Sequence, residues 1–182
     1  MTARFIKDAS TADVVRHFLR MEASRESIRR QWPESVEWIK LPDEELLITA
    51  REFALEREEN PALAWTVGTA DNSFYKMVKA WSLSEIRLDE LYTCGVRKNM
   101  EPDLNAVAGN LKRFFDTGRA NSYPSDFEIR AAPVERQLLM CIDNSRDDKD
   151  GCLELIDGAH RAIAMIADGT ETCRAYVATL VE

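Results

Sequence analysis

The residues of this sequence that could act together in chemistry lie in one short string, Asp157-Gly158-Ala159-His160-Arg161. The run before it, residues 152–156, is apolar with a β-branched end and predicts a buried strand. The residues after it place apolar side chains at helical spacing and predict a short helix that stops at Gly169. We therefore expect a strand to turn sharply into a helix at Gly158, with His160 and Arg161 in the first helical turn.

A helix that begins at this corner could bind an anion, most often a phosphate, because its first backbone N–H groups lack acceptors and carry roughly half a positive charge. Gly158 lets the backbone approach closely, Arg161 could hold two oxygens, and His160 could donate or accept a hydrogen bond. Asp157 could orient a hydroxyl or help to hold a metal. The alternative is structural: Asp157 caps the helix, Gly158 makes the turn, and His160 and Arg161 face solvent.

The string Leu-Ile-Asp-Gly-Ala-His-Arg-Ala-Ile-Ala at residues 155–164, followed by Asp-Gly and a last strand, resembles the signature of the ParB/sulfiredoxin-like superfamily. Its members include ParB-type nucleotide-binding domains, free serine kinases, sulfiredoxins and Osa-type fertility inhibitors. The resemblance extends from Leu83 to the C-terminus and does not cover residues 1–80. It implies a small mixed sheet with helices, in which Gly158, Ala159, His160 and Arg161 bind the phosphates of a nucleotide.

Three departures from family patterns narrow this expectation. Ala159 occupies the position at which sulfiredoxins carry their reactive cysteine, so repair of sulfinic acids is not expected. The sequence ends at Glu182, soon after the last strand, without the helix-turn-helix region of DNA-segregation members. Kinase members use an acid outside the turn as the base that activates a substrate hydroxyl. We assign that role to Glu85, although spacing leaves other carboxylates open: Asp89, Glu90 and Glu101.

Composition limits the classes of partner. The formal net charge of −8 over 182 residues argues against broad nucleic-acid binding, which relies on a basic surface. The sequence contains no apolar stretch long enough for a membrane span and no signal-peptide run at its start, so we expect a cytoplasmic protein that does not bind membranes. The four cysteines form no Cys-x-x-Cys pair, and with two histidines they do not predict a zinc site.

The pattern along the chain predicts an α+β fold in two parts. Residues 1–80 are expected to be an all-α region, acting as a cap or an extension. Its helices are predicted over 8–31, with a capping box at Ser10 and Asp13, over 43–58, and around Phe74, Met77, Val78 and Trp81. Residues 81–182 are expected to form the nucleotide-binding domain, with strands at 83–88, 138–142 and 173–181 and a helix from Pro102 to Gly118.

The leading hypothesis is a Mg²⁺-dependent phosphotransferase or NTPase that uses ATP, ADP or CTP and a small hydroxyl-bearing substrate. Its catalytic residues would be Asp157, His160, Arg161 and Glu85, with Arg161 stabilising charge during transfer. One alternative is a regulatory interaction protein of the plasmid or phage inhibitor type, with little or no catalysis and a protein partner. Another is a DNA-processing protein, which the acidic charge balance disfavours. The sequence does not identify the acceptor, the nucleotide or the oligomeric state.

Overall fold

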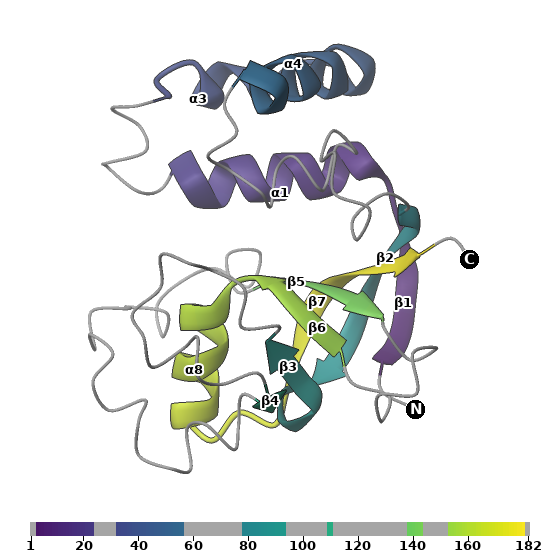
Figure 1. The fold of residues 1–182 in the computed structure, drawn as a ribbon, viewed down its shortest axis with the longest axis vertical. Helices are drawn as coiled ribbons and strands as arrows, with labels where there is room; N and C mark the ends of the chain where they lie inside the picture. The colour runs from purple at the N-terminus through teal and green to yellow at the C-terminus, as the bar shows by residue number, and fades with distance from the viewer. Residues whose placement is uncertain are drawn as a thin grey trace. The chain divides into compact units, whose positions relative to one another are not determined.

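A computed structural model of the chain describes residues 3–23, 32–56, 78–93, 109–110, 138–143 and 153–180 (Figure 1). Contacts divide the chain into two compact units, Met1–Lys7 with Ser82–Leu180, and Asp8–Trp81 with Val181–Glu182. The described helices are α1 (Thr11–Ala23), α3 (Ser35–Trp38), α4 (Asp43–Glu56) and α8 (Ala159–Ala167), with a 3-10 turn, η1, at Leu88–Glu90. The described strands are β1 (Ala3–Ala9), β2 (Val78–Arg87), β3 (Leu91–Thr93), β4 (Gly109–Asn110), β5 (Leu139–Asp143), β6 (Leu153–Asp157) and β7 (Thr172–Leu180).

The described strands form one mixed sheet in the order β1-β2-β7-β5-β6-β3-β4. β5 runs antiparallel to β6 and parallel to β7, and β3 runs parallel to β6. The predicted α+β class is therefore confirmed. So are the three strands read from apolar runs around 140, 155 and 177, because buried central strands carry a strong local signal.

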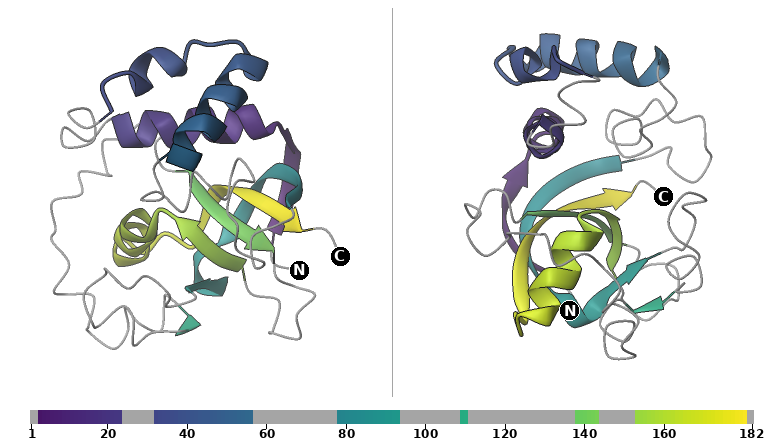
Figure 2. Two further views of the ribbon diagram at one scale, coloured as in Figure 1. Left: turned by 45° about the horizontal axis from the view of Figure 1, so that its top comes forward. Right: turned by 90° about the vertical axis from the view of Figure 1, so that its left-hand side faces the viewer.

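The core of the sheet-containing unit lies between α8 and the strands, which Figures 1 and 2 show side by side. Ala162, Met165 and Ile166 supply the buried side of α8, as their helical spacing predicts. They belong to one cluster of buried apolar residues with Ile86, Leu88, Leu91, Leu139, Cys141, Leu153, Leu155, Ala175 and Val177.

The helical unit begins with the predicted capping box. The N–H of Asp13 donates to Ser10 Oγ at 3.0 Å, and the N–H of Ser10 donates to Asp13 Oδ2 at 3.1 Å. The predicted apolar face of α1 is buried; its members are Val14, Val15, Phe18 and Leu19. On α4, Leu46 and Ala50 are fully buried, and Phe53 meets Trp32 and Trp38 in edge-to-face ring contacts.

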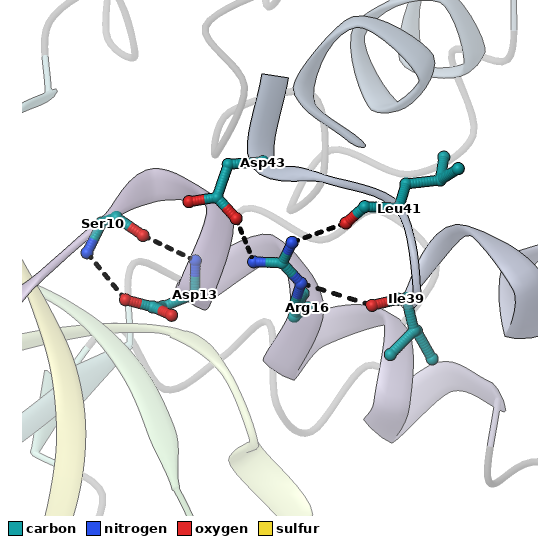
Figure 3. A network of polar contacts seen from close by, with 6 residues as sticks. All are labelled: Ser10, Asp13, Arg16, Ile39, Leu41 and Asp43. Carbon is teal, nitrogen blue, oxygen red and sulfur yellow. Dashed lines mark hydrogen bonds and ion pairs between the residues drawn. The ribbon is translucent and has the colours of Figure 1, made fainter. Parts of the chain in front are cut away.

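Arg16 fastens α1 to the segment between α3 and α4 (Figure 3). Its guanidinium donates to the carbonyl of Ile39 at 3.3 Å and to the carbonyl of Leu41 at 2.7 Å. Its third nitrogen, Nη1, lies 2.6 Å from Asp43 Oδ1 in the first turn of α4. A single cation therefore satisfies two carbonyls of the α3–α4 connection and also meets a carboxylate at a helix N-terminus.

The all-α prediction for residues 1–80 is wrong at both ends. β1 occupies Ala3–Ala9, and β2 already begins at Val78, where a helix was expected to continue through Trp81. β1 shows no alternation of buried and exposed residues, since five consecutive members, Arg4 to Asp8, are exposed. Its structure comes from pairing with β2 at the sheet edge rather than from burial, and a sequence pattern does not reveal such pairing. Residues 24–31 and 57–77 lie outside the described residues.

The helix predicted from Pro102 to Gly118 is also wrong where it can be compared. Gly109 and Asn110 form β4, whose register with β3 pairs Asn110 with Tyr92 and Gly109 with Thr93. Glycine and asparagine are poor helix formers, and the edge of β3 offers their backbone groups an alternative ladder. The rest of that predicted helix lies outside the described residues.

Candidate functional site

The predicted corner between strand and helix is present. β6 ends at Asp157, Gly158 follows as the N-cap residue, and α8 begins at Ala159. Gly158 has φ +98°, a left-handed conformation that side chains other than glycine rarely adopt. A Cβ at this position would lie 2.6 Å from Leu139 Cδ2 and 3.0 Å from Arg161 Nη2. Backbone conformation and close packing therefore both require glycine here.

Arg161 is buried rather than exposed. The residue retains 5% of its accessible surface, and Nη2 lies 2.6 Å from Asp157 Oδ2. Nη1 donates to the carbonyl of Leu138, just before β5. The guanidinium thus lies close to Gly158. It connects Asp157, at the end of β6, with Leu138, the residue before β5. The structural alternative, in which Arg161 faces solvent and Asp157 caps the helix, is wrong, because Asp157 is paired with a buried cation and Gly158 holds the cap position.

The start of α8 has the polarity expected of an anion site. The N–H of Ala162 donates to the carbonyl of Gly158 at 2.9 Å and closes the first turn. The N–H groups of Ala159 and His160 precede this bond and have no acceptor within the helix. Gly158 supplies no side chain that could accept from them. The positive end of the helix dipole therefore lies at this corner, directly after Asp157.

An irregularity in the ladder between β5 and β6 sets the position of Asp157. Cys141 pairs with Leu155, but Met140 pairs with Asp157, so β6 holds one extra residue at Ile156. This is the pattern of a β-bulge, which redirects the side chains that follow it. The bulge lies one residue before the carboxylate that binds Arg161.

Two of the other candidate acids, Glu85 and Asp89, are paired with arginines other than Arg161. Glu85 forms an ion pair with Arg4 at 3.1 Å, and Asp89 binds Arg87 through two contacts of 3.0 and 2.6 Å. Glu90 lies one residue before Leu91, which pairs with Leu153 at the opposite end of β6 from Asp157. Four strand residues separate those ends by about 13 Å. Glu101 lies outside the described residues, as do the side chains of Ala159 and His160.

Sequence reasoning missed the partner that holds Arg161 in place, the carbonyl of Leu138. It also missed two thiols near the guanidinium. Burial raises the pKa of Cys173 to about 12 and the pKa of Cys141 well above 9.0, and Arg161 opposes both shifts more weakly. Burial therefore favours the protonated form of both thiols, which is the less nucleophilic form.

Among the described residues, no His, Cys, Asp and Glu side chains gather in threes as they would around a metal ion. None of the described helices is long and apolar enough to span a membrane. Comparison of the chain with protein-family models, curated proteins and solved structures found no match.

Proposed function

We propose that the Asp157–Arg161 corner binds the phosphates of a nucleotide, ATP, ADP or CTP, and that the chain is a Mg²⁺-dependent phosphotransferase or NTPase. The observation that carries the proposal is Gly158 at φ +98° opening α8, which places the start of a helix, whose first N–H groups lack intrahelical acceptors, directly after Asp157. The resemblance of residues 155–164 to the nucleotide-binding turn of the ParB/sulfiredoxin-like superfamily points to the same ligand.

In this proposal the N–H groups of Ala159 and His160 contact the phosphate, and Arg161 acts mainly through its ion pair. A lone carboxylate at Asp157 would repel a phosphate, and the guanidinium 2.6 Å away offsets that charge. The same pair fixes the end of β6 against the start of α8. Arg161 therefore prepares the corner for an anion and stabilises the charge that develops there during transfer.

Mg²⁺ fits this corner only in its common mode, in which a protein supplies one or two carboxylates and the nucleotide supplies phosphate oxygens. Asp157 has one oxygen, Oδ1, outside its ion pair with Arg161. That oxygen would bind the metal or orient a substrate hydroxyl. Glu85 remains the described carboxylate that we propose as the base, and it would reach a substrate only by leaving Arg4.

The two glycines at the ends of α8 provide a matched test. Gly169 also has a positive φ, +76°, but apart from its chain neighbours no described residue has an atom within 4 Å of where its Cβ would be. We expect Gly158→Ala to abolish most of the nucleotide affinity of the full chain, and Gly169→Ala to leave it within about twofold although both substitutions strain the helix. Thermal shift and calorimetric titration with ATP, ADP and CTP, with and without Mg²⁺, measure this. Equal affinities in the two variants, or no nucleotide binding by the unmodified chain, would remove the proposal.

A second candidate is the regulatory interaction protein. The observation that favours it is the pairing of Glu85 with Arg4 and of Asp89 with Arg87, which leaves Asp157 as the described carboxylate at the corner. Nucleotide binding without phosphate release or transfer to added hydroxyl compounds would support it. Turnover that requires Mg²⁺ and is lost in Glu85→Gln would support the enzyme instead.

A further inference from the structure

The strand β1 forms one edge of the sheet, with β2 as its neighbour among the described strands (Figure 1). Five consecutive residues, Arg4 to Asp8, are exposed, so neither face of this stretch is covered. Phe5 is 61% exposed and Ile6 is 39% exposed, and the two project to opposite faces because they are adjacent in a strand. An exposed edge strand with apolar side chains on both faces is a template for pairing with another strand.

The order of residues in β1 identifies the partner that fits it. The strand reads Ala-Arg-Phe-Ile-Lys-Asp-Ala, with Ile6 at its centre. In an antiparallel pair of two such strands centred on Ile6, Arg4 lies opposite Asp8 of the second copy, and Asp8 lies opposite its Arg4. Phe5 and Lys7 face each other in the same reciprocal way, and Ile6 meets Ile6. Every position of the strand then has a complementary neighbour, and Arg4, which also pairs with Glu85 of its own chain, gains a second carboxylate beside it.

We propose that two copies of this chain associate through antiparallel pairing of their β1 strands, with the two-fold axis at Ile6. On one face the Ile6 pair lies between two Arg4–Asp8 ion pairs. On the other face each Lys7 ammonium lies beside the ring of Phe5, as in a cation–π contact. Directly opposed residues of this kind are the contacts that stabilise paired strands. The association does not depend on the proposed nucleotide site.

One feature favours pairing of β1 over an edge that avoids pairing, and a second favours a closed dimer over a fibre that grows by adding further copies. Edge strands often avoid pairing by carrying proline or charged side chains. β1 has no proline, and its opposite charges, Arg4 and Asp8, stand at mirror positions about Ile6, where they attract in a pair of identical strands. The strand at the other end of the described sheet, β4, has two residues, too few to continue the ladder. Pairing of identical edges is isologous, so it closes after two copies.

Charge reversal tests the pairing directly. Arg4→Asp places aspartate opposite aspartate, and Asp8→Arg places arginine opposite arginine, so we expect each variant of the full chain to dimerise at least about tenfold more weakly than the unmodified chain. An equimolar mixture of the two variants restores opposite charges at both positions. We therefore expect the mixture to form a heterodimer with an affinity close to that of the unmodified chain. Sedimentation equilibrium measures each affinity, and energy transfer between labelled variants measures the mixed species.

Matched controls change the same charge elsewhere. Glu52→Arg on α4 and Arg20→Asp on α1 alter exposed residues of helices instead of β1, and we expect neither to change dimerisation by more than about twofold. The mixture separates pairing from misfolding, because unfolded variants would not rescue each other. A monomeric unmodified chain at high concentration, a mixture as weak as its components, or controls as weak as the β1 variants would each overturn the proposal.

Discussion

Arg161 and Asp157 form an ion pair whose side chains retain 7% and 14% of their accessible surface. Removing two charges from water is costly, and their attraction offsets that cost only when hydrogen bonds complete the arrangement. The carbonyl of Leu138 supplies such a bond. The pair therefore affects stability mainly through the cost of breaking it. Without Arg161, a largely buried carboxylate would lose its cation and the Leu138 carbonyl would lose this donor.

We expect Arg161→Met to lower the free energy of unfolding by about 3 kcal/mol, because it leaves the largely buried Asp157 carboxylate without its cation. Adding Asp157→Asn should recover part of this loss by removing the stranded charge. Arg87→Met is the matched control, since that guanidinium is 61% exposed and also pairs with an aspartate. Its removal should cause no measurable change. Urea unfolding of the full chain measures all four proteins, and equal losses in the two arginine variants would contradict this account.

For single residues, the sequence predicts where the turn from strand to helix lies, but it does not predict which atoms the Arg161 side chain contacts. The order of Asp157, Gly158 and Arg161, with an apolar run on each side, is sufficient to predict a strand, a glycine turn and a helix. The direction of the Arg161 side chain depends on a carbonyl at Leu138, 23 residues earlier in the chain. Local spacing does not report a contact of that separation, which explains why the guanidinium was expected to face a ligand or the solvent.

Among the elements, those with strong internal patterns are predictable. α1 and α4 follow from their apolar stripes and first-turn acids. α8 ends at Ala167, and Gly169, the residue expected to stop it, follows two positions later with a positive φ. Near Gly169 the N–H of Thr170 donates to the carbonyl of Met165 at 2.9 Å, the closure typical of a left-handed helix end. β1, β3 and β4 escape prediction because they lie toward the sheet edges or are too short to show a period. Their structure depends on neighbours distant in sequence.

The connection of α1 to α4 depends on Arg16 in the same way. We expect Arg16→Met to lower the free energy of unfolding by about 2 kcal/mol, because two carbonyls lose charged donors while the apolar stem is retained. Arg20→Met, one turn later on the same helix at an exposed position, should cost less than about 0.5 kcal/mol. Chemical denaturation followed by the fluorescence of the tryptophans gives both values. Similar losses in Arg16→Met and Arg20→Met would show that both variants report helix propensity and not the hydrogen bonds of Arg16.

For the whole molecule, the thiols of Cys141 and Cys173 impose a limit on stability at alkaline pH. Burial raises the pKa of Cys173 from 9.0 to about 12, so the unfolded chain loses this proton at a lower pH than the folded chain does. The contribution to stability is complete below pH 9 and is lost as the pH rises toward 12. Cys141 adds a loss of the same sign.

We therefore expect the unfolding midpoint of the unmodified chain to fall steeply above pH 9, and that of Cys173→Ala to fall less over the same range. Thermal unfolding under reducing conditions at a series of pH values measures the difference between the two slopes. Parallel curves for the two proteins would mean that the thiol of Cys173 titrates alike in the folded and unfolded chains.

Because β6 holds one extra residue, Ile156, the geometry of the Asp157–Arg161 ion pair depends on the number of residues in this strand. Deleting Ile156 would leave the aspartate opposite Met140, as it is now, but would remove the bend that the extra residue introduces into β6 just before Gly158. The aspartate side chain would then approach Arg161 from a different direction, although every other amino acid had been kept. Substitutions in β6 that keep its apolar residues apolar should therefore disturb the Asp157–Arg161 ion pair less than the gain or loss of a single residue.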